Sequence, residues 1–204
     1  MVQNDYPSEL LKQAIEQFKS LPGIGERTAL RLVLFLLKQD KQKALAFGET
    51  INNFIEHVQF CEVCYNISDS KKCSICESSH RNKKVICVVE NVKDVMSIER
   101  TKTYNGVYHV LGGLISPMDG IGPSDLTIDA LVNRIDNSEV SEIILATSAT
   151  MEGETTNFFI NKKLKNKDIP VSVIARGVSF GSDLEFTDEL TLGKAISNRT
   201  PFGK

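Results

Sequence analysis

The first 58 positions carry hydrophobic residues at helical spacing. Residues 7–20, PSELLKQAIEQFKS, read as a helix that Ser8 caps just after Pro7. The segment LPGIG interrupts the pattern, ERTALRLVLFLLKQ resumes it, and a third helix is expected from Lys41 to Gln59. Three short helices around a glycine turn bury little by themselves. The apolar positions of the first and third helices are Leu10, Leu11, Ile15, Phe18, Leu45, Ile51, Phe54, Ile55 and Val58.

From Lys84 onward, short apolar runs alternate with amphipathic segments. The runs VICVVE, GVYHVLGG, SEIILATS and PVSVIARGV predict strands, and ENVKDVMSIER, DLTIDALVNRI and TTNFFINKKLKN predict helices between them. The last segment, DELTLGKAISNRTPFGK, predicts one more helix with a flexible end. Strands that alternate with helices of this length indicate a parallel α/β sheet.

Composition narrows the class of protein. Of the 204 residues, 41% are hydrophobic and 25% are charged, as in globular proteins. No apolar run approaches the roughly 20 residues of a membrane span, and the N-terminus has no signal-peptide pattern. We therefore expect a cytoplasmic protein that does not enter membranes. The net charge of −2 gives no global attraction to nucleic acid, so DNA contacts must come from local basic patches or backbone amides.

Four of the five cysteines lie in CEVCYNISDSKKCSIC, as two C-x2-C pairs separated by eight residues. Each pair can place two thiolates on one ion, and four thiolates suit tetrahedral Zn²⁺ with no open position for substrate. The sequence therefore predicts one structural zinc ion; the alternatives are unliganded thiols or an iron centre of rubredoxin type. The expected ligands are Cys61, Cys64, Cys73 and Cys76. Cys87, within VICVV, is expected to be a small buried hydrophobe.

The segment LPGIGERTALRL predicts a tight glycine hairpin between two helices. Such a turn leaves amide N–H groups open at the start of the second helix, where they can hold a phosphate oxygen. The segment resembles the helix-hairpin-helix element, which grips the nucleic-acid backbone without reading bases. The alternative is a turn that only packs helices together, and Glu26 weakens the local positive field. The candidate DNA contacts are Lys19, Gly23, Ile24, Gly25, Arg27 and Arg31.

VVENVKDVMSIER and EIILATSATMEGE resemble the Toprim fold of type IA topoisomerases and bacterial primases. In that pattern the first strand ends in a glutamate, matched here by Glu90, and a later loop carries an Asp-x-Asp pair. Those aspartate positions fall on Ser148 and Thr150, while Glu152 and Glu154 match the acidic end of the loop. Hydroxyls replace carboxylates poorly around Mg²⁺. We therefore expect no metal-dependent cleavage or polymerisation; the alternative for this run is an ordinary α/β strand and turn.

A rival interpretation is an enzyme, namely a Mg²⁺-dependent Toprim nuclease or primase-like protein. It would use Glu90, Glu152 and either Asp119 or Asp183. A third interpretation is a protein-binding adaptor whose hairpin never meets DNA. His109 can be considered as a catalytic base, but its place inside the strand YHVLGG favours a structural role.

The order of these elements, from about Pro7 to Arg199, resembles the bacterial RecR recombination-mediator family. The strings YHVLGG and GSDLEF strengthen the resemblance, whereas Ser148 and Ala149 stand where family members commonly carry Asn-Pro. The resemblance implies a helix-hairpin-helix region at 1–58, a zinc finger at 59–79, a Toprim domain at 80–177 and a C-terminal region at 178–204.

The resemblance also implies a non-enzymatic DNA-repair protein. RecR proteins form rings, commonly tetramers, and work with RecO and RecF to load RecA onto single strands coated by single-strand-binding protein. A dimer or tetramer that binds DNA without sequence preference, at the nucleoid during repair, is therefore expected. By position, the glycine hairpin would meet DNA, and Glu90, Glu152 and Glu154 would form the docking face for RecO. A ring adds weak backbone contacts together, so no single subunit needs to be basic.

Overall fold

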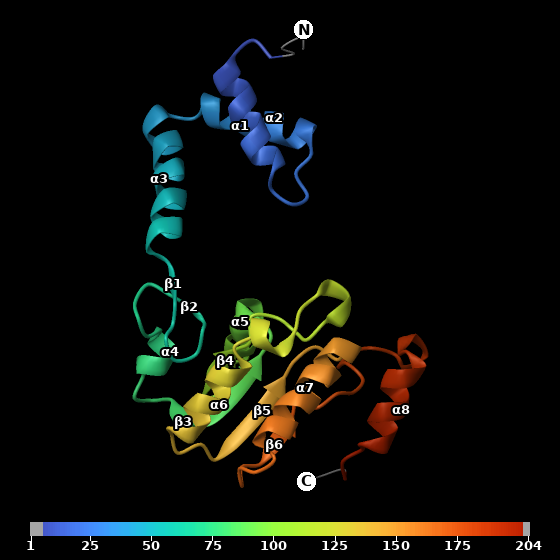
Figure 1. The fold of residues 1–204 in the computed structure, drawn as a ribbon. Coiled ribbons are helices and arrows are strands. Elements are labelled where there is room, and N and C mark those ends of the chain that lie inside the picture. Colours follow the sequence, from blue (N-terminus) through green and yellow to red (C-terminus); the bar gives the residue numbers. More distant parts are fainter. Residues whose placement is uncertain (1–5, 202–204) are drawn as a thin grey trace. The chain divides into compact units, whose positions relative to one another are not determined.

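The computed structural model describes residues 6–201, which fall into two compact units divided after Val58 (Figure 1). The first unit is helical, and its elements are α1 (Glu9–Lys19), α2 (Glu26–Lys38) and α3 (Lys41–His57). Ser8 caps α1 as predicted, because its Oγ accepts a hydrogen bond from the Leu11 N–H at 3.4 Å.

The core of the helical unit lies between α1 and α2. Ile15, Ala29 and Val33 are its buried residues, and Leu11, Phe18 and Ile24 pack against them. Leu10, one of the predicted apolar positions, does not join this core and is 78% exposed.

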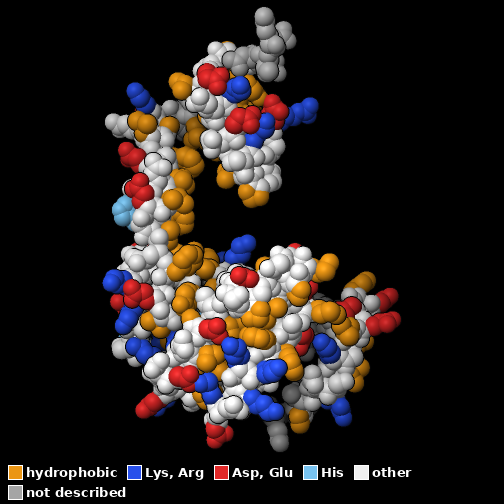
Figure 2. All heavy atoms as spheres, in the orientation of Figure 1, with side chains coloured by type: hydrophobic (Ala, Val, Ile, Leu, Met, Phe, Trp, Pro, Cys, Tyr) orange, Lys and Arg blue, Asp and Glu red, His pale blue; other side chains and the backbone are white. Residues whose placement is uncertain are grey.

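Helix α3 has an apolar stripe that its own unit does not cover. From Lys41 to His57 no residue is buried, and Ile51, Phe54 and Ile55 are each about half exposed or more. Figure 2 shows these apolar side chains gathered along the helix. The helix forms as expected, but its hydrophobic face lacks an intramolecular partner among the described residues of the helical unit.

The second unit contains the predicted parallel sheet. Its strands run in the order β4-β3-β5-β6, with Val89 opposite both Val110 and Ala146 in register. The last strand is shorter than PVSVIARGV suggested, because pairing with β5 stops after three residues. The strands are β3 (Asn82–Val89), β4 (Gly106–Val110), β5 (Glu142–Ala146) and β6 (Val171–Val173).

Helices cover both faces of this sheet (Figure 1). One face packs against α6 and α7 through Leu131, Ile135 and Ile160, while α5 covers the other through Val95. The sequence also predicts a flexible end after the last helix; its final residues, 202–204, lie outside the described residues. The helices from β3 onward are α5 (Val92–Thr101), α6 (Ile128–Asp136), α7 (Met151–Leu164) and α8 (Glu189–Ser197), with 3-10 turns η1 (Pro117–Asp119), η2 (Pro123–Asp125) and η3 (Leu184–Phe186).

The cysteine segment packs onto the sheet rather than standing apart. It consists of β1 (Gln59–Phe60), β2 (Ile67–Ser68) and α4 (Ser74–Glu77). The Val110 N–H, at the end of β4, donates to the Cys64 carbonyl at 2.8 Å. The ring of Tyr65 meets that of His109 edge-on, with centroids 5.5 Å apart. Ile75 packs against the cysteine cluster and against both faces of the sheet core, so the segment and the sheet share one body.

Candidate functional site

The four predicted metal ligands converge. The two knuckles at Cys61–Cys64 and Cys73–Cys76 bring their sulfur atoms within 4.8 Å of one another, and all four residues are at most 8% exposed. The Cys73 N–H donates to the Cys61 sulfur at 3.3 Å, a backbone bond that stabilises a thiolate. This donor set fits Zn²⁺, and four sulfurs leave no position for substrate.

The thiols cannot all ionise without a cation. The sulfurs of Cys64 and Cys73 lie 3.5 Å apart. Their shared hydrogen bond lowers the pKa of Cys73 and raises the pKa of Cys64, since only one of the two can keep the proton. Cys87 lies outside this cluster, and burial raises the pKa of its thiol to about 12, as expected for an inert core residue.

The glycine hairpin has the open geometry that phosphate contacts require. Gly23 has a φ of +80°, a left-handed conformation that favours glycine, and Gly25 precedes α2 without a side chain to cap it. No atom lies within 4 Å of the place a Cβ would take at either glycine. The amides of Glu26, Arg27 and Thr28, in the first turn of α2, have no backbone hydrogen-bond acceptor among the described residues. Ile24 packs inward against the α1–α2 core, as predicted.

Cationic side chains follow α2 away from this hairpin. Arg27 and Arg31 line one hollow on the helix together with Lys38, a residue that sequence reasoning missed. The spacing of four and seven residues places all three on one face, and this is the signal that would have found Lys38.

Two other charged side chains near the hairpin already have partners within the chain. Lys19 bonds to Glu16 at 3.0 Å, an interaction that raises the pKa of the lysine. Glu26 accepts a hydrogen bond from the Tyr6 hydroxyl at 2.6 Å. Arg27 and Arg31 are thus better placed than Lys19 to contact a ligand.

The residues at the Toprim-like positions meet at one edge of the sheet. Strands β3 and β5 are parallel neighbours, so Glu90 and the loop from Thr147 leave the sheet side by side. The two hydroxyls at the aspartate positions serve the fold. Thr150 caps α7 by accepting the Gly153 N–H at 3.2 Å, and its Oγ1 lies 3.3 Å from the Ser148 Oγ.

The expected acidic loop is in fact the beginning of a helix, which corrects the sequence interpretation. Glu152 and Glu154 lie in the first turn of α7, because Thr150 starts that helix earlier than the pattern suggested. Two positions apart on a helix, the carboxylates point in different directions. Glu154 forms an ion pair with Arg176, three residues after the end of β6, a contact that could not be foreseen from the pattern of residues. Throughout residues 6–201, the one group of three or more close metal-ligand side chains is the cysteine cluster.

The remaining acids and the histidine also lie apart from these positions. Asp119 accepts a hydrogen bond from the Ser116 hydroxyl at 2.6 Å, and Asp183 precedes η3. His109 is fully buried, its Nε2 lies 3.0 Å from the Thr127 carbonyl oxygen, and burial lowers its pKa to about 4. These contacts give His109 a structural role that holds the start of α6 to β4.

Gly153 permits the tight turn at this edge, which leads to a prediction. A Cβ there would lie 2.0 Å from the Ser148 carbonyl oxygen. Gly153→Ala is expected to lower the free energy of unfolding by about 1–3 kcal/mol, as overpacking does, in a urea denaturation experiment. Gly193→Ala in α8 is the matched control, because nothing lies within 4 Å of its Cβ position and alanine favours a helix. Equal stability of the two variants would contradict the prediction.

Four family models match successive parts of the chain. They describe a RecR helix-hairpin-helix, a RecR four-cysteine zinc finger domain, a Toprim domain and a RecR C-terminal region, over residues 11–55, 58–78, 84–175 and 177–200. The zinc-finger match and the converging cysteines together identify one structural zinc ion per chain, and the iron and unliganded alternatives are set aside. None of the helices in the described part of the chain is long and apolar enough to cross a membrane.

Whole-chain relatives agree with these matches. Recombination protein RecR of Phocaeicola vulgatus is 56% identical over 197 residues, which cover 97% of this chain and 96% of the relative. The proteins of the same name from Bacteroides fragilis and Flavobacterium johnsoniae are 54% and 52% identical over 97% and 98% of the chain, covering 96% and 97% of the relatives. With RecR family models matched along its length and more than half of its residues identical to those of these relatives, this chain belongs to the RecR family of recombination proteins.

Proposed function

We propose that this protein is a non-enzymatic mediator that binds DNA as a ring-like oligomer and, with RecO and RecF, loads RecA onto gapped or protein-coated single strands. Its family supports a role in DNA repair and recombination. In this proposal residues 1–58 bind DNA and a second subunit, 59–79 form the finger, 80–177 form the Toprim scaffold, and 178–204 complete the fold and contact another subunit.

The observation that carries DNA binding is the hairpin with its stripe of cations. The uncapped start of α2 offers amide donors, and Arg27 and Arg31 continue on the exposed side of the same helix. Backbone N–H groups and arginines contact phosphates without reading bases, so binding would be independent of sequence. A net charge of −2 per chain is compatible with binding, because several subunits of an oligomer act together.

Two exposed apolar faces support the oligomer. One is the α3 stripe, and the other lies in the C-terminal region, where Phe180 and Phe186 are more than 80% exposed. The two faces belong to different units of the chain, and in this proposal each pairs with its copy on another subunit. Two self-complementary interfaces on one chain close into a ring of even number, which favours a tetramer.

The Toprim edge supports a docking role for a basic partner, which we propose is RecO. Glu90 directly follows β3 and Glu152 lies in the first turn of α7, and neither forms an ion pair with any residue from 6 to 201. Glu154 contributes less, because Arg176 already neutralises it. Complementary charge would speed association with the partner more than it strengthens the complex.

A gapped duplex in Mg²⁺ tests this function against the enzyme alternative. We expect the protein to sediment with the DNA as a single oligomer and to leave every strand intact, because hydroxyls occupy the aspartate positions. Turnover that Glu90→Gln abolishes would overturn the proposal in favour of a nuclease. Sedimentation of the free protein as a monomer, with no larger species on DNA, would overturn the ring.

A further inference from the structure

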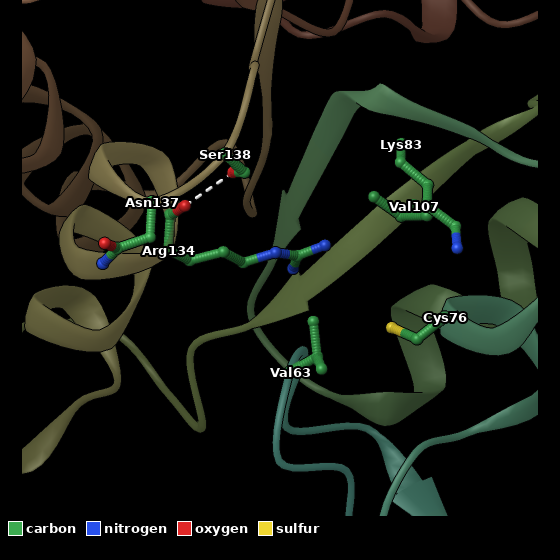
Figure 3. A pocket seen from close by; sticks show the side chains of 7 residues that line it. All are labelled: Val63, Cys76, Lys83, Val107, Arg134, Asn137 and Ser138. Atoms are coloured by element: carbon green, nitrogen blue, oxygen red, sulfur yellow. Dashed lines mark hydrogen bonds between the residues drawn. The ribbon is translucent and has the colours of Figure 1, made fainter.

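A small cavity beside the zinc site holds two cations that no carboxylate neutralises. It measures about 260 Å³ and lies between the finger, β3, β4 and α6 (Figure 3). Arg134 reaches into it from α6, and Lys83 borders it from β3. Neither forms an ion pair with a residue in the described part of the chain. The cavity is lined by Val63, Cys76, Lys83, Val107, Arg134, Asn137 and Ser138.

Arg134 is held in place rather than free in solvent. Its Nη1 donates to the Tyr108 carbonyl oxygen at 2.6 Å, and the side chain is half-buried. In Figure 3 its guanidinium and the sulfur of Cys76 point into the same space. A half-buried guanidinium is less hydrated than one in bulk solvent, so a nearby negative charge stabilises it more than it would stabilise an exposed arginine.

The zinc cluster supplies that negative charge. Four thiolates around Zn²⁺ leave two negative charges in excess, and Cys76 lies on the wall of the cavity. Arg134 and Lys83 together carry the matching positive charge. The two positive side chains and the net charge of the zinc cluster therefore cancel. This balance favours a role for Arg134 and Lys83 in neutralising the cluster rather than in binding a separate anion.

We propose that Arg134 and Lys83 are counter-ions of the zinc tetrathiolate, so that the finger's affinity for zinc depends on a helix outside the finger. The positive charge of the guanidinium on α6 lowers the electrostatic repulsion among the four sulfur ligands. Partners just beyond the metal ligands orient those ligands and tune the metal. Lys83 contributes less, because it is exposed to solvent and its charge is screened by salt.

Zinc transfer to a chromogenic chelator at fixed pH and ionic strength tests this proposal on the full-length protein. Loss of an outer residue that hydrogen-bonds a ligand costs about 10–100-fold in metal affinity; Arg134 acts through its charge alone, so we expect Arg134→Gln to weaken zinc binding by about tenfold, the low end of that range. Arg134→Lys should keep most of the affinity because it keeps the charge. Lys83→Gln should have a smaller effect in the same direction.

The matched control is Lys84→Gln, which removes the same charge one residue away. Lys84 pairs with Glu139 at 2.8 Å on the surface and does not line the cavity, so its loss should leave zinc affinity unchanged. The proposal is overturned if Arg134→Gln and Arg134→Lys lose zinc equally, or if Lys84→Gln matches Lys83→Gln. Circular dichroism checks folding; if Arg134→Gln unfolds, the comparison of Lys83→Gln with Lys84→Gln decides alone, because both residues are exposed.

Discussion

Cys64→Ser is expected to release the zinc ion and to destabilise the sheet as well as the finger. Structural zinc contributes about 10–16 kcal/mol to the folding of finger peptides, which matches or exceeds the roughly 5–15 kcal/mol that stabilises a whole domain. Cys64 also carries the carbonyl that accepts the Val110 N–H at the end of β4. If the knuckle at Cys64 loses its shape, the hydrogen bond to Val110 is lost as well, and the end of β4 is destabilised. Zinc content, thermal unfolding and amide hydrogen exchange of β4 would measure the effect.

Cys87→Ala provides the control for the loss of a buried sulfur. Cys87 lies in the core outside the cluster, so this variant should keep a full equivalent of zinc and lose only packing energy. A Cys64→Ser protein with a full equivalent of zinc and normal protection of β4 would refute the expectation.

The second large effect is expected on DNA binding. Replacing Arg27 and Arg31 together with alanine should weaken binding steeply, because every subunit of a ring would lose the same two contacts. The slope of log affinity against log salt falls by about 0.9 for each phosphate contact that is lost. A salt titration with fluorescent duplex and single strands would give both the affinity and the slope.

The control for this variant removes two lysines of the same unit. Lys41 and Lys43 lie in the first turn of α3 and do not line the hollow that Arg27 and Arg31 share. Replacing both with alanine changes the charge equally and should change the slope far less. If the two double variants gave equal slopes, the hairpin and its arginines would not be the DNA contact. That result would favour an adaptor whose hairpin does not bind DNA.

The parts of the structure that local sequence determines could be predicted. Two C-x2-C pairs within sixteen residues define the metal site, since each knuckle needs only its own turn. The alternation of apolar runs and amphipathic segments likewise predicts the parallel sheet, because burial on both faces makes each strand apolar.

Contacts between distant positions could not be predicted in this way. The pair of Glu154 and Arg176 depends on how α7 and β6 meet, and the periodicity of either segment contains no such information. The exposure of the apolar stripe on α3 could not be predicted either. Its pattern predicts a helix with an apolar face, but only the structure shows that no residue of the chain's described helical unit covers it.

Ile75 restricts how the finger can be exchanged between proteins. Its side chain contacts the cysteine cluster and the core on both faces of the sheet. A finger grafted onto an unrelated protein would expose this side chain, and an unrelated finger inserted here would leave a hole in the sheet core. The ligand cysteines alone therefore do not make a transferable module; a chimera would have to carry the isoleucine and its receiving surface together.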